Sequence, residues 1–377
     1  GERKAGGTVE VQASTTDILP TVLDVLNVAR PSRLDGQSLK QNFEGGSSEP
    51  QPVFGETNYP LSFGWASLRS VREPGRKYIE APRPELYDLR TDPREQHNIY
   101  QPWDPELKSM REKLAAQREK YPERSAVKSG GAVGVETTQE LQALGYLGAA
   151  DALSSSTVAE PSLLPDPKDK IAEQNLLHAA MLAVDDGRIA DARGELKKVL
   201  LLDENSNAAL TQLGQLELNA GDYAEAAAHF GRARLLRPED ANVAMNQGEA
   251  LSKTGDFASA KAALEASLKM NPGQYRGRFL LGSVCFALHD FNAAQDQLEA
   301  ALLMQSTAEA QKKLGEVFLA QDKFEAARQQ LEGAIKVQPD SAEAYELLAR
   351  AYAGLGNMEG ASKARTRAKA LAPPKTQ

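Results

Sequence analysis

The sequence predicts a mainly α-helical protein, in which an α-solenoid of helix-turn-helix repeats follows a small α+β region with a short antiparallel sheet. Two observations support this expectation. Small residues recur about every 34 residues from residue 173 onward, which is typical of repeat architectures. Residues 52–90 instead have the alternation and the turn signals of strands. We therefore expect an N-terminal part (1–125), a short helix with an Ala/Ser/Pro-rich linker (126–170) and six repeats (171–375).

The N-terminal part is expected to open with a helix from Thr16 to about Val28. Asp17 stands at the start of this helix, where a carboxylate can accept hydrogen bonds from the free amides of the first turn and interacts favourably with the helix dipole. We therefore interpret it as a cap rather than a metal ligand. Three strands are expected next, with a Pro-Gly turn between the first two: 67–72, 76–80 and 85–89.

Helical signals return after the strands. Asp104 as N-cap and Pro105 at the first position predict a helix that runs to Tyr121. A shorter helix is expected over 137–144, because Gly145 can end it. The stretch 148–170 is rich in Ala, Ser and Pro without an apolar period, so we expect a linker there.

The repeats are defined by small residues at fixed places. A glycine recurs with spacings of 34, 34 and 33 residues at Gly214, Gly248, Gly282 and Gly315. Every copy has an alanine at a second place: Ala192, Ala226, Ala260, Ala294, Ala327 and Ala361. Each copy holds two apolar-periodic stretches of helical length, such as 207–220 and 223–236. The small residues allow the paired helices to approach closely, and the pairs must stack because none can bury its apolar face alone.

Composition excludes several classes of protein. The 377 residues include 44 Lys and Arg against 52 Asp and Glu, a net charge of −8, which disfavours nucleic-acid binding. The single cysteine excludes internal disulfides and cysteine-rich zinc sites. No membrane span is expected, because the longest apolar run, 279–288, is about half the necessary length. The chain begins with Gly rather than Met, so we expect a piece of something longer.

The repeat pattern resembles the tetratricopeptide repeat (TPR). This resemblance implies a right-handed solenoid whose concave groove, lined by the first helix of each copy, binds a protein or peptide. The candidate partner-binding residues are Gln215, Met245, Arg276, Phe279, Phe286 and Lys312. We expect Arg276 and Lys312 to face solvent, whereas the two phenylalanines and Met245 could belong either to the groove or to the core between repeats.

One subclass of these repeats clamps a partner's C-terminal carboxylate with Lys and Asn at fixed places. This chain has Thr211 and Gln215 there, and Gly277 where a second cation belongs. This departure disfavours a carboxylate clamp. Met245, Phe279 and Phe286, with Arg276 and Lys312 at their edge, instead suggest a mixed apolar and polar groove for a helix or an extended segment.

The first 150 residues resemble the C-terminal portion of a sulfatase of the alkaline-phosphatase superfamily. The matching stretches are 14–21, 34–39, Gly55-Glu56, 69–72, 77–79, 85–89, Asp92-Pro93, 95–98 and 143–148. In that family the nucleophile, a formylglycine made from Cys or Ser in the pattern Cys/Ser-x-Pro-x-Arg, and a calcium ion lie before the matched part. The pattern is absent here, so no catalytic residue, metal ligand or cofactor is expected in this chain.

Two functions follow from these resemblances. The first is a protein-interaction scaffold attached to the non-catalytic tail of a sulfatase-like hydrolase. The alternative is a sulfuric-ester or related phosphate-ester hydrolase whose catalytic part lies upstream of Gly1. Bacterial sulfatases are often exported, so the resemblance implies an extracytoplasmic or periplasmic location.

Other chemically capable residues are interpreted as structural. The histidines have no helical pairing: His97, His178, His229 and His289. Cys285 lies in an apolar run and is expected to be a small buried hydrophobe. Four aromatic residues are expected in the core rather than at a sugar-stacking site: Tyr59, Phe63, Trp65 and Trp103. A basic run coats the last helix as a polar end of the array: Lys363, Arg365, Arg367 and Lys369.

Overall fold

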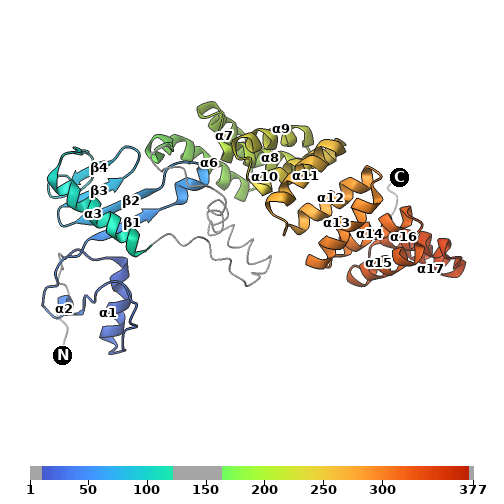
Figure 1. The fold of residues 1–377 in the computed structure, drawn as a ribbon, viewed down its shortest axis with the longest axis horizontal. Coiled ribbons are helices and arrows are strands. Elements are labelled where there is room, and N and C mark those ends of the chain that lie inside the picture. Colours follow the sequence, from blue (N-terminus) through green and yellow to red (C-terminus); the bar gives the residue numbers. More distant parts are fainter. Residues whose placement is uncertain (1–10, 122–163, 373–377) are drawn as a thin grey trace. The chain divides into compact units, whose positions relative to one another are not determined.

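The computed structural model describes residues 11–121 and 164–372, and the chain divides into two compact units, Gly1–Ala172 and Glu173–Gln377 (Figure 1). The helix expected over 137–144 and the part of the expected linker before residue 164 lie outside the described residues. We describe each unit by itself.

The first unit opens with two short helices. A 3₁₀ turn, η1 (Thr15–Asp17), leads into α1 (Ile18–Val25), and α2 (Lys40–Phe43) follows. Asp17 stands at the start of α1 as expected, but its side chain makes no cap hydrogen bond to that helix. Its carboxylate instead accepts from the amide of Ser14, the N-cap of η1, at 2.8 Å and from the Gln37 amide at 2.8 Å. α1 ends before Val28, because Asn27 adopts a left-handed φ of 56° that a helix does not accommodate.

A four-stranded antiparallel sheet forms the centre of this unit. The strands are β1 (Val53–Thr57), β2 (Leu68–Glu73), β3 (Arg76–Glu80) and β4 (Glu85–Asp88), in that order across the sheet. The last three match the expected strands, whereas the sequence analysis did not single out β1. The only apolar side chains of β1 are Val53 and Phe54, so its apolar–polar alternation is too short to predict a strand, and the strand is defined by its pairing with β2.

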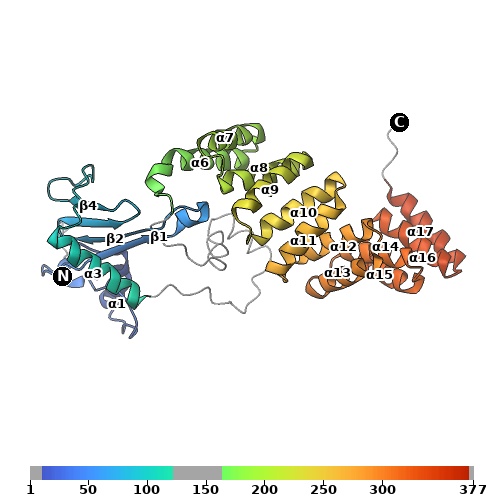
Figure 2. The ribbon, with the colours of Figure 1, turned by 45° about the horizontal axis from the view of Figure 1, so that its top comes forward.

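The sheet buries one face against α3 (Pro105–Lys120), which lies across it in Figures 1 and 2. The register pairs Val71 with Tyr78 and Tyr78 with Leu86, so these three side chains form one buried row. α3 packs Leu107, Met110 and Leu114 on that row. The helix starts as expected, since the Asp104 carboxylate accepts from the amides of residues 106 and 107.

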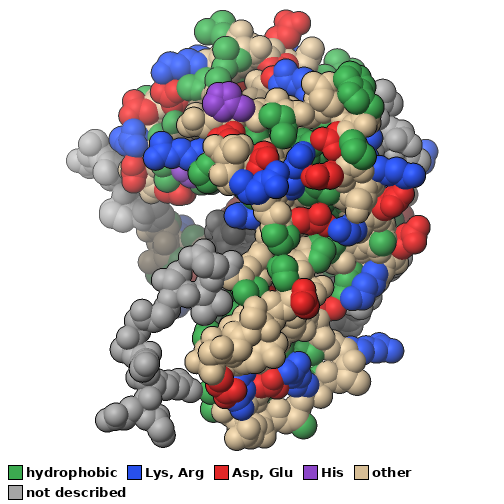
Figure 3. Space-filling model, turned by 90° about the vertical axis from the view of Figure 1, so that its left-hand side faces the viewer, with side chains coloured by type: hydrophobic (Ala, Val, Ile, Leu, Met, Phe, Trp, Pro, Cys, Tyr) green, Lys and Arg blue, Asp and Glu red, His purple; other side chains and the backbone are tan. Residues whose placement is uncertain are grey.

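The aromatic residues of this unit divide between core and surface. Trp65 is buried, as expected, and Phe63 stacks on it with ring centroids 4.8 Å apart. The expectation of a core position is wrong for Tyr59, which is exposed, and for Trp103, which is 78% exposed. Trp103 lies in the turn just before α3, outside the row that the helix buries. On the face of the molecule shown in Figure 3, basic and acidic side chains of the described residues are interspersed.

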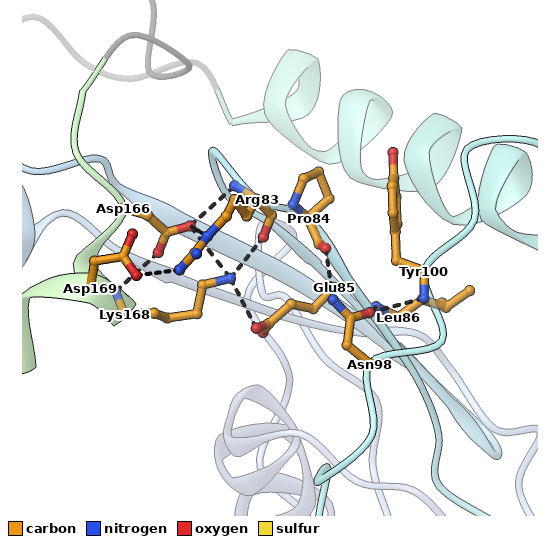
Figure 4. A network of polar contacts seen from close by, with 9 residues as sticks. All are labelled: Arg83, Pro84, Glu85, Leu86, Asn98, Tyr100, Asp166, Lys168 and Asp169. Atoms are coloured by element: carbon orange, nitrogen blue, oxygen red, sulfur yellow. Dashed lines mark hydrogen bonds and ion pairs between the residues drawn. The ribbon is translucent and has the colours of Figure 1, made fainter.

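The end of the expected linker is attached to the sheet. The Ala66 amide donates to the Pro165 carbonyl at 2.9 Å, and the buried Asp166 carboxylate accepts from the amides of Arg83 at 3.1 Å and Lys168 at 3.0 Å (Figure 4). The Lys168 ammonium lies 2.9 Å from the Glu85 carboxylate and donates to the Arg83 carbonyl at 2.7 Å. Residues 164–170, which include η4 (Pro167–Lys170), therefore belong to the first unit, and the linker prediction is wrong for them.

Twelve helices follow one another as six pairs over described residues 171–371. They are α6 (Ile171–Asp185), α7 (Ile189–Leu202), α8 (Asn207–Ala220), α9 (Tyr223–Leu236), α10 (Ala241–Thr254), α11 (Phe257–Met270), α12 (Tyr275–Ala287), α13 (Phe291–Met304), α14 (Ala308–Ala320), α15 (Phe324–Val337), α16 (Ala342–Gly354) and α17 (Met358–Leu371). The bounds of α8 and α9 are those expected from the apolar period. We call these pairs 1 to 6, each with a first and a second helix.

A left-handed residue joins the two helices of each pair. Four of them are glycines: Gly187, Gly221, Gly255 and Gly356. His289 and Asp322 take the same place with φ of 61° and 56°, so His289 is a turn residue, as expected.

The recurring small residues lie where the two helices of a pair touch. A Cβ on Gly248 would lie 2.6 Å from Leu264 Cγ, and one on Gly282 would lie 2.7 Å from Leu298 Cγ. The recurring alanines are buried with them. Gly and Ala therefore set how closely the helices pack, as the sequence analysis expects.

Candidate protein-binding face on the first helices

The first helices of successive pairs contact one another: α8 with α10, α10 with α12, α12 with α14 and α14 with α16. All six candidate residues lie on these helices. Gln215 is on α8, Met245 on α10, Arg276, Phe279 and Phe286 on α12, and Lys312 on α14. We call the surface that bears these six residues the first-helix face.

The apolar candidates are shared between core and surface. Met245, Phe279 and Phe286 are half-buried, and all three pack against the core cluster that runs from pair 3 to pair 6. The ring of Phe279 stacks on Tyr275 with centroids 6.3 Å apart, and the Lys313 ammonium lies 5.3 Å from the centroid of Phe286. Each side chain therefore has one side in the core and another that remains accessible.

The cationic candidates are already paired. Arg276 Nη2 donates to both carboxylate oxygens of Glu249 at 2.7 Å, and Lys312 pairs with Glu343. Each pair joins two successive first helices. The expectation that both cations face solvent is correct for Arg276, which is exposed, and wrong for Lys312, whose side chain is 24% exposed. Neither cation is left without a carboxylate, because Glu249 and Glu343 lie on the neighbouring helices.

Gln215 also belongs to a polar network along this face. Its amide donates to Asn219 Oδ1 at 2.9 Å, and its carbonyl oxygen accepts from Asn246 at 3.4 Å. Gly277 is buried, and a Cβ there would lie 3.2 Å from Leu268. No cation therefore occupies the clamp positions at 211, 215 and 277 in the described part of the chain.

The ion pairs between neighbouring repeats were not predicted, although the spacing of the charged residues contains a signal for them. Arg276 and Glu249 are 27 residues apart, and Lys312 and Glu343 are 31 apart. The separation of 27 residues is shorter than one repeat of about 34 residues by two helical turns, and the separation of 31 is shorter by one turn. Opposite charges at such spacings on first helices indicate contacts between neighbouring pairs.

The pair between Arg276 and Glu249 gives a stability prediction. We expect Arg276→Glu to destabilise the array by about 1 kcal/mol, because it removes a charge-assisted hydrogen bond and places two carboxylates together. The swapped variant Glu249→Arg/Arg276→Glu should recover most of this loss. Urea unfolding followed by circular dichroism measures both variants. Equal stability of Arg276→Glu and the wild type would show that the pair contributes nothing.

Other candidate residues have structural environments. Cys285 is buried, and this burial raises the pKa of its thiol, which lowers its reactivity. His229 Nδ1 lies 2.6 Å from the Glu217 carboxylate inside pair 2. Among the residues described, no three His, Cys, Asp or Glu side chains come together as a metal site. The described helices include none that is long and apolar enough to cross a membrane.

Comparison with curated proteins finds one relative of the sulfatase class. An N-acetylglucosamine-6-O-sulfatase of Bacteroides thetaiotaomicron is 30% identical over 106 residues. The matched part is 26% of this chain and 19% of the relative, so the chain spans about a fifth of that protein's length.

Solved structures with similar folds include three proteins with low sequence identity. A MamA protein is 22% identical with a TM-score of 0.41, over 44% of this chain and 91% of that chain. YrrB, described as a TPR protein with an unusual peptide-binding site, is 19% identical with a TM-score of 0.42, over 48% and 93%. A tetratricopeptide repeat protein from Parabacteroides merdae is 17% identical with a TM-score of 0.48, over 54% and 81%.

Family models of the tetratricopeptide repeat match most of the second unit. One model matches residues 177–241, 211–256 and 312–375, and another matches 251–316. Together they cover 177–375, which is more than half of the 377 residues. The helix pairs, their left-handed turns and their close packing agree with these matches. The chain thus belongs to the tetratricopeptide repeat family.

Proposed function

We propose that this chain is a protein-binding scaffold that holds a helix or an extended segment of a partner on the first-helix face between α10 and α14. The observation that supports this is the set of half-buried apolar side chains, Met245, Phe279 and Phe286, on adjoining helices. Anchors of this kind, partly fixed by the core, lose little side-chain freedom when a partner covers them.

The ion pairs have a different role in this proposal. Because Arg276 and Lys312 are held by Glu249 and Glu343, they fix the spacing of α10, α12, α14 and α16 rather than attract an acidic partner. The affinity for a partner would then come from apolar contacts, and the polar side chains around them would select among partners. Charge reversal at these two cations is therefore a poor test, since it also disturbs the array.

The test replaces apolar anchors with polar side chains of similar length. We expect Met245→Gln/Phe279→Gln to weaken binding of an isolated partner about 30-fold or more, because two central anchors are lost. The partner is identified by affinity capture with the full chain, and its affinity is then measured by isothermal titration calorimetry. Leu303→Gln, on the second helix α13, is the matched control and should bind like the wild type. Unchanged affinity of the double variant, at wild-type helix content, would contradict the proposal.

We further propose that the first unit is the C-terminal part of a sulfatase-like domain. The 30% identical sulfatase supports this, and so does the surface of α1. That helix buries Pro20 and Thr21 but exposes a row of apolar side chains: Ile18, Leu19, Val22, Val25 and Leu26. An apolar row of this size is expected to be covered by other parts of the same domain.

In this proposal the hydrolytic chemistry belongs to residues preceding the present sequence. A formylglycine, a calcium ion and the sulfuric-ester or phosphate-ester substrate would all bind there, and an extracytoplasmic location would follow by analogy. In the alternative function, the main role of the parent protein is ester hydrolysis, and the repeats are an accessory scaffold. A gene that encodes Cys/Ser-x-Pro-x-Arg with metal-ligand carboxylates upstream of Gly1 would make the parent protein the enzyme, whereas a reading frame that starts near Gly1 leaves only the scaffold.

Activity of the chain itself is a direct test. We expect purified residues 1–377 not to hydrolyse aryl sulfates or aryl phosphates, with or without calcium, because the sequence lacks the nucleophile pattern. Release of nitrophenol or nitrocatechol, followed spectrophotometrically, measures this. Turnover that co-purifies with the chain through a second column would show that the catalytic residues lie within it.

A further inference from the structure

A cavity of about 210 Å³ lies between pair 5 and pair 6, where α14, α15 and α16 meet. Small side chains line it: Ala308 of α14, Ala334 of α15, and Ser341 and Ala344 at the start of α16. Lys312, one of the residues of the first-helix face, lines it as well. The cavity therefore adjoins the first-helix face.

The preceding repeat shows what fits this place. Tyr275 is the first residue of α12, and Ala308 is the first residue of α14. The N-cap of the following first helix is Thr307 in one case and Ser341 in the other. Between pairs 4 and 5, the Tyr275 hydroxyl lies 2.5 Å from Thr307 Oγ1, and the ring stacks on Phe279. The tyrosine ring thus occupies the place that the cavity takes one repeat later, where alanine stands instead of tyrosine.

The junction between pairs 3 and 4 is filled by a different side chain. The equivalent of Ser341 is there Gln274, and the equivalent of Ala334 is Ser267. Ser267 Oγ lies 2.6 Å from Gln274 Oε1 and 2.6 Å from the Ala241 carbonyl oxygen. Side chains of the array therefore fill this place at two junctions, whereas only small residues surround it between pairs 5 and 6. Because an unfilled cavity lowers stability, this one points to a ligand from outside the array.

The size and the lining of the cavity restrict the ligand. A cavity of about 150 Å³ accommodates benzene, whereas sites for drug-sized ligands measure about 300–1,000 Å³, so this cavity suits one aromatic ring. The Ser341 hydroxyl accepts from the Ala344 amide at 3.2 Å, as Thr307 accepts from the Ala310 amide at 3.2 Å. Thr307 makes this bond while it contacts Tyr275. Ser341 likewise retains a hydroxyl hydrogen and a second lone pair for a phenol.

We propose that this cavity receives the side chain of a tyrosine of the partner protein, with the ring against the alanines and the hydroxyl bonded to Ser341. The bound tyrosine takes the place that Tyr275 takes between pairs 4 and 5. This proposal rests on the proposed function, since the tyrosine belongs to the segment held on the first-helix face. It adds one anchor residue that this segment must contain.

The probe for the cavity is p-cresol, which is the side chain of tyrosine without its backbone. Saturation-transfer NMR with the full chain should show p-cresol binding with a Kd of the order of 1 mM. Toluene, which lacks the hydroxyl, should bind about fivefold more weakly, and Ser341→Ala should reduce the affinity for p-cresol to that for toluene. Absence of p-cresol binding up to about 10 mM would overturn the proposal, and so would equal affinities of the wild type for the two ligands.

A variant that fills the cavity provides a second test. Ala308→Tyr should place a ring of the chain itself in the cavity, abolish p-cresol binding and raise the melting temperature. Ala342→Tyr is the same change at the first residue of α16, which does not line the cavity, and should bind p-cresol like the wild type. Binding of p-cresol that survives in Ala308→Tyr would show that the ligand occupies another place.

Two further measurements separate this proposal from the proposed function. Met245→Gln/Phe279→Gln should leave p-cresol binding unchanged, because neither residue lines the cavity. A partner captured with the wild type should bind Ala308→Tyr about tenfold more weakly or worse. If the partner binds this variant as tightly as the wild type, the ligand is not a tyrosine of the partner, and a free phenol would be the ligand instead.

Discussion

Replacing Gly248 with leucine is expected to destabilise the repeat array by about 1–3 kcal/mol, through overpacking. The reason is the contact between α10 and α11, where even a single Cβ on Gly248 would lie 2.6 Å from Leu264 Cγ and 3.2 Å from the Ala260 carbonyl oxygen. Either the two helices must separate or Leu264 must leave its rotamer. Chemical unfolding followed by the helical circular dichroism signal measures the loss.

Two variants separate overpacking from a general effect of replacing glycine. Gly194 lies in α7, where an added Cβ would meet no neighbouring atom within 4 Å, so Gly194→Ala should instead stabilise the array by about 0.5–1 kcal/mol. Adding Leu264→Ala to Gly248→Leu should cost less than the sum of the single changes, because the leucine at 248 fills the space that Leu264 leaves. Strict additivity would show that the two side chains do not compete for one space.

Replacing Asp166 with alanine is expected to destabilise the first unit by about 1–3 kcal/mol. Asp166 is 5% exposed, and its carboxylate accepts from the amides of Arg83 and Lys168, which would both lose this acceptor on substitution. Both tryptophans of the chain, Trp65 and Trp103, lie in this unit, so tryptophan fluorescence follows its unfolding separately from the helical array. Trp65 is the sensitive reporter, since the next residue, Ala66, bonds to Pro165.

Asp169 provides a matched control on the same short segment. Its ion pair with Arg83 is exposed, so Asp169→Ala should change stability by no more than about 0.5–1 kcal/mol. If both variants unfold like the wild type by tryptophan fluorescence, the contacts of the segment 164–170 contribute no stability to the first unit.

The repeat half of the fold could be predicted because its determinants are local. The left-handed turn after each first helix, the glycine opposite Leu264 and the bounds of α8 and α9 all follow from residues within one repeat. In a solenoid each helix packs only on its neighbours, so the distance between residues along the sequence predicts most of the contacts between helices. The candidate partner-binding residues were assigned to one groove by the resemblance to the tetratricopeptide repeat.

The polar contacts of the candidate site could not be predicted in the same way. The family resemblance assigned Arg276 and Lys312 to the groove, but whether each meets solvent or a carboxylate depends on the neighbouring helix. The resemblance likewise left open how far Phe279 and Phe286 enter the core. Their half-burial results from how closely α12 packs on α13 and α14.

Sequence alone determined that the second unit is an array of tetratricopeptide repeats, because period, turn residues and close-packing residues recur within about 34 positions. Tertiary structure decided the contacts between residues that are distant in sequence. Asp166 accepts a hydrogen bond from the Arg83 amide across 83 residues, and β1 pairs with β2 to complete the sheet. Tertiary structure also decided that Trp103 is exposed while Trp65 is buried. These outcomes depend on which surfaces meet after the chain has folded back on itself, and no local pattern specifies that.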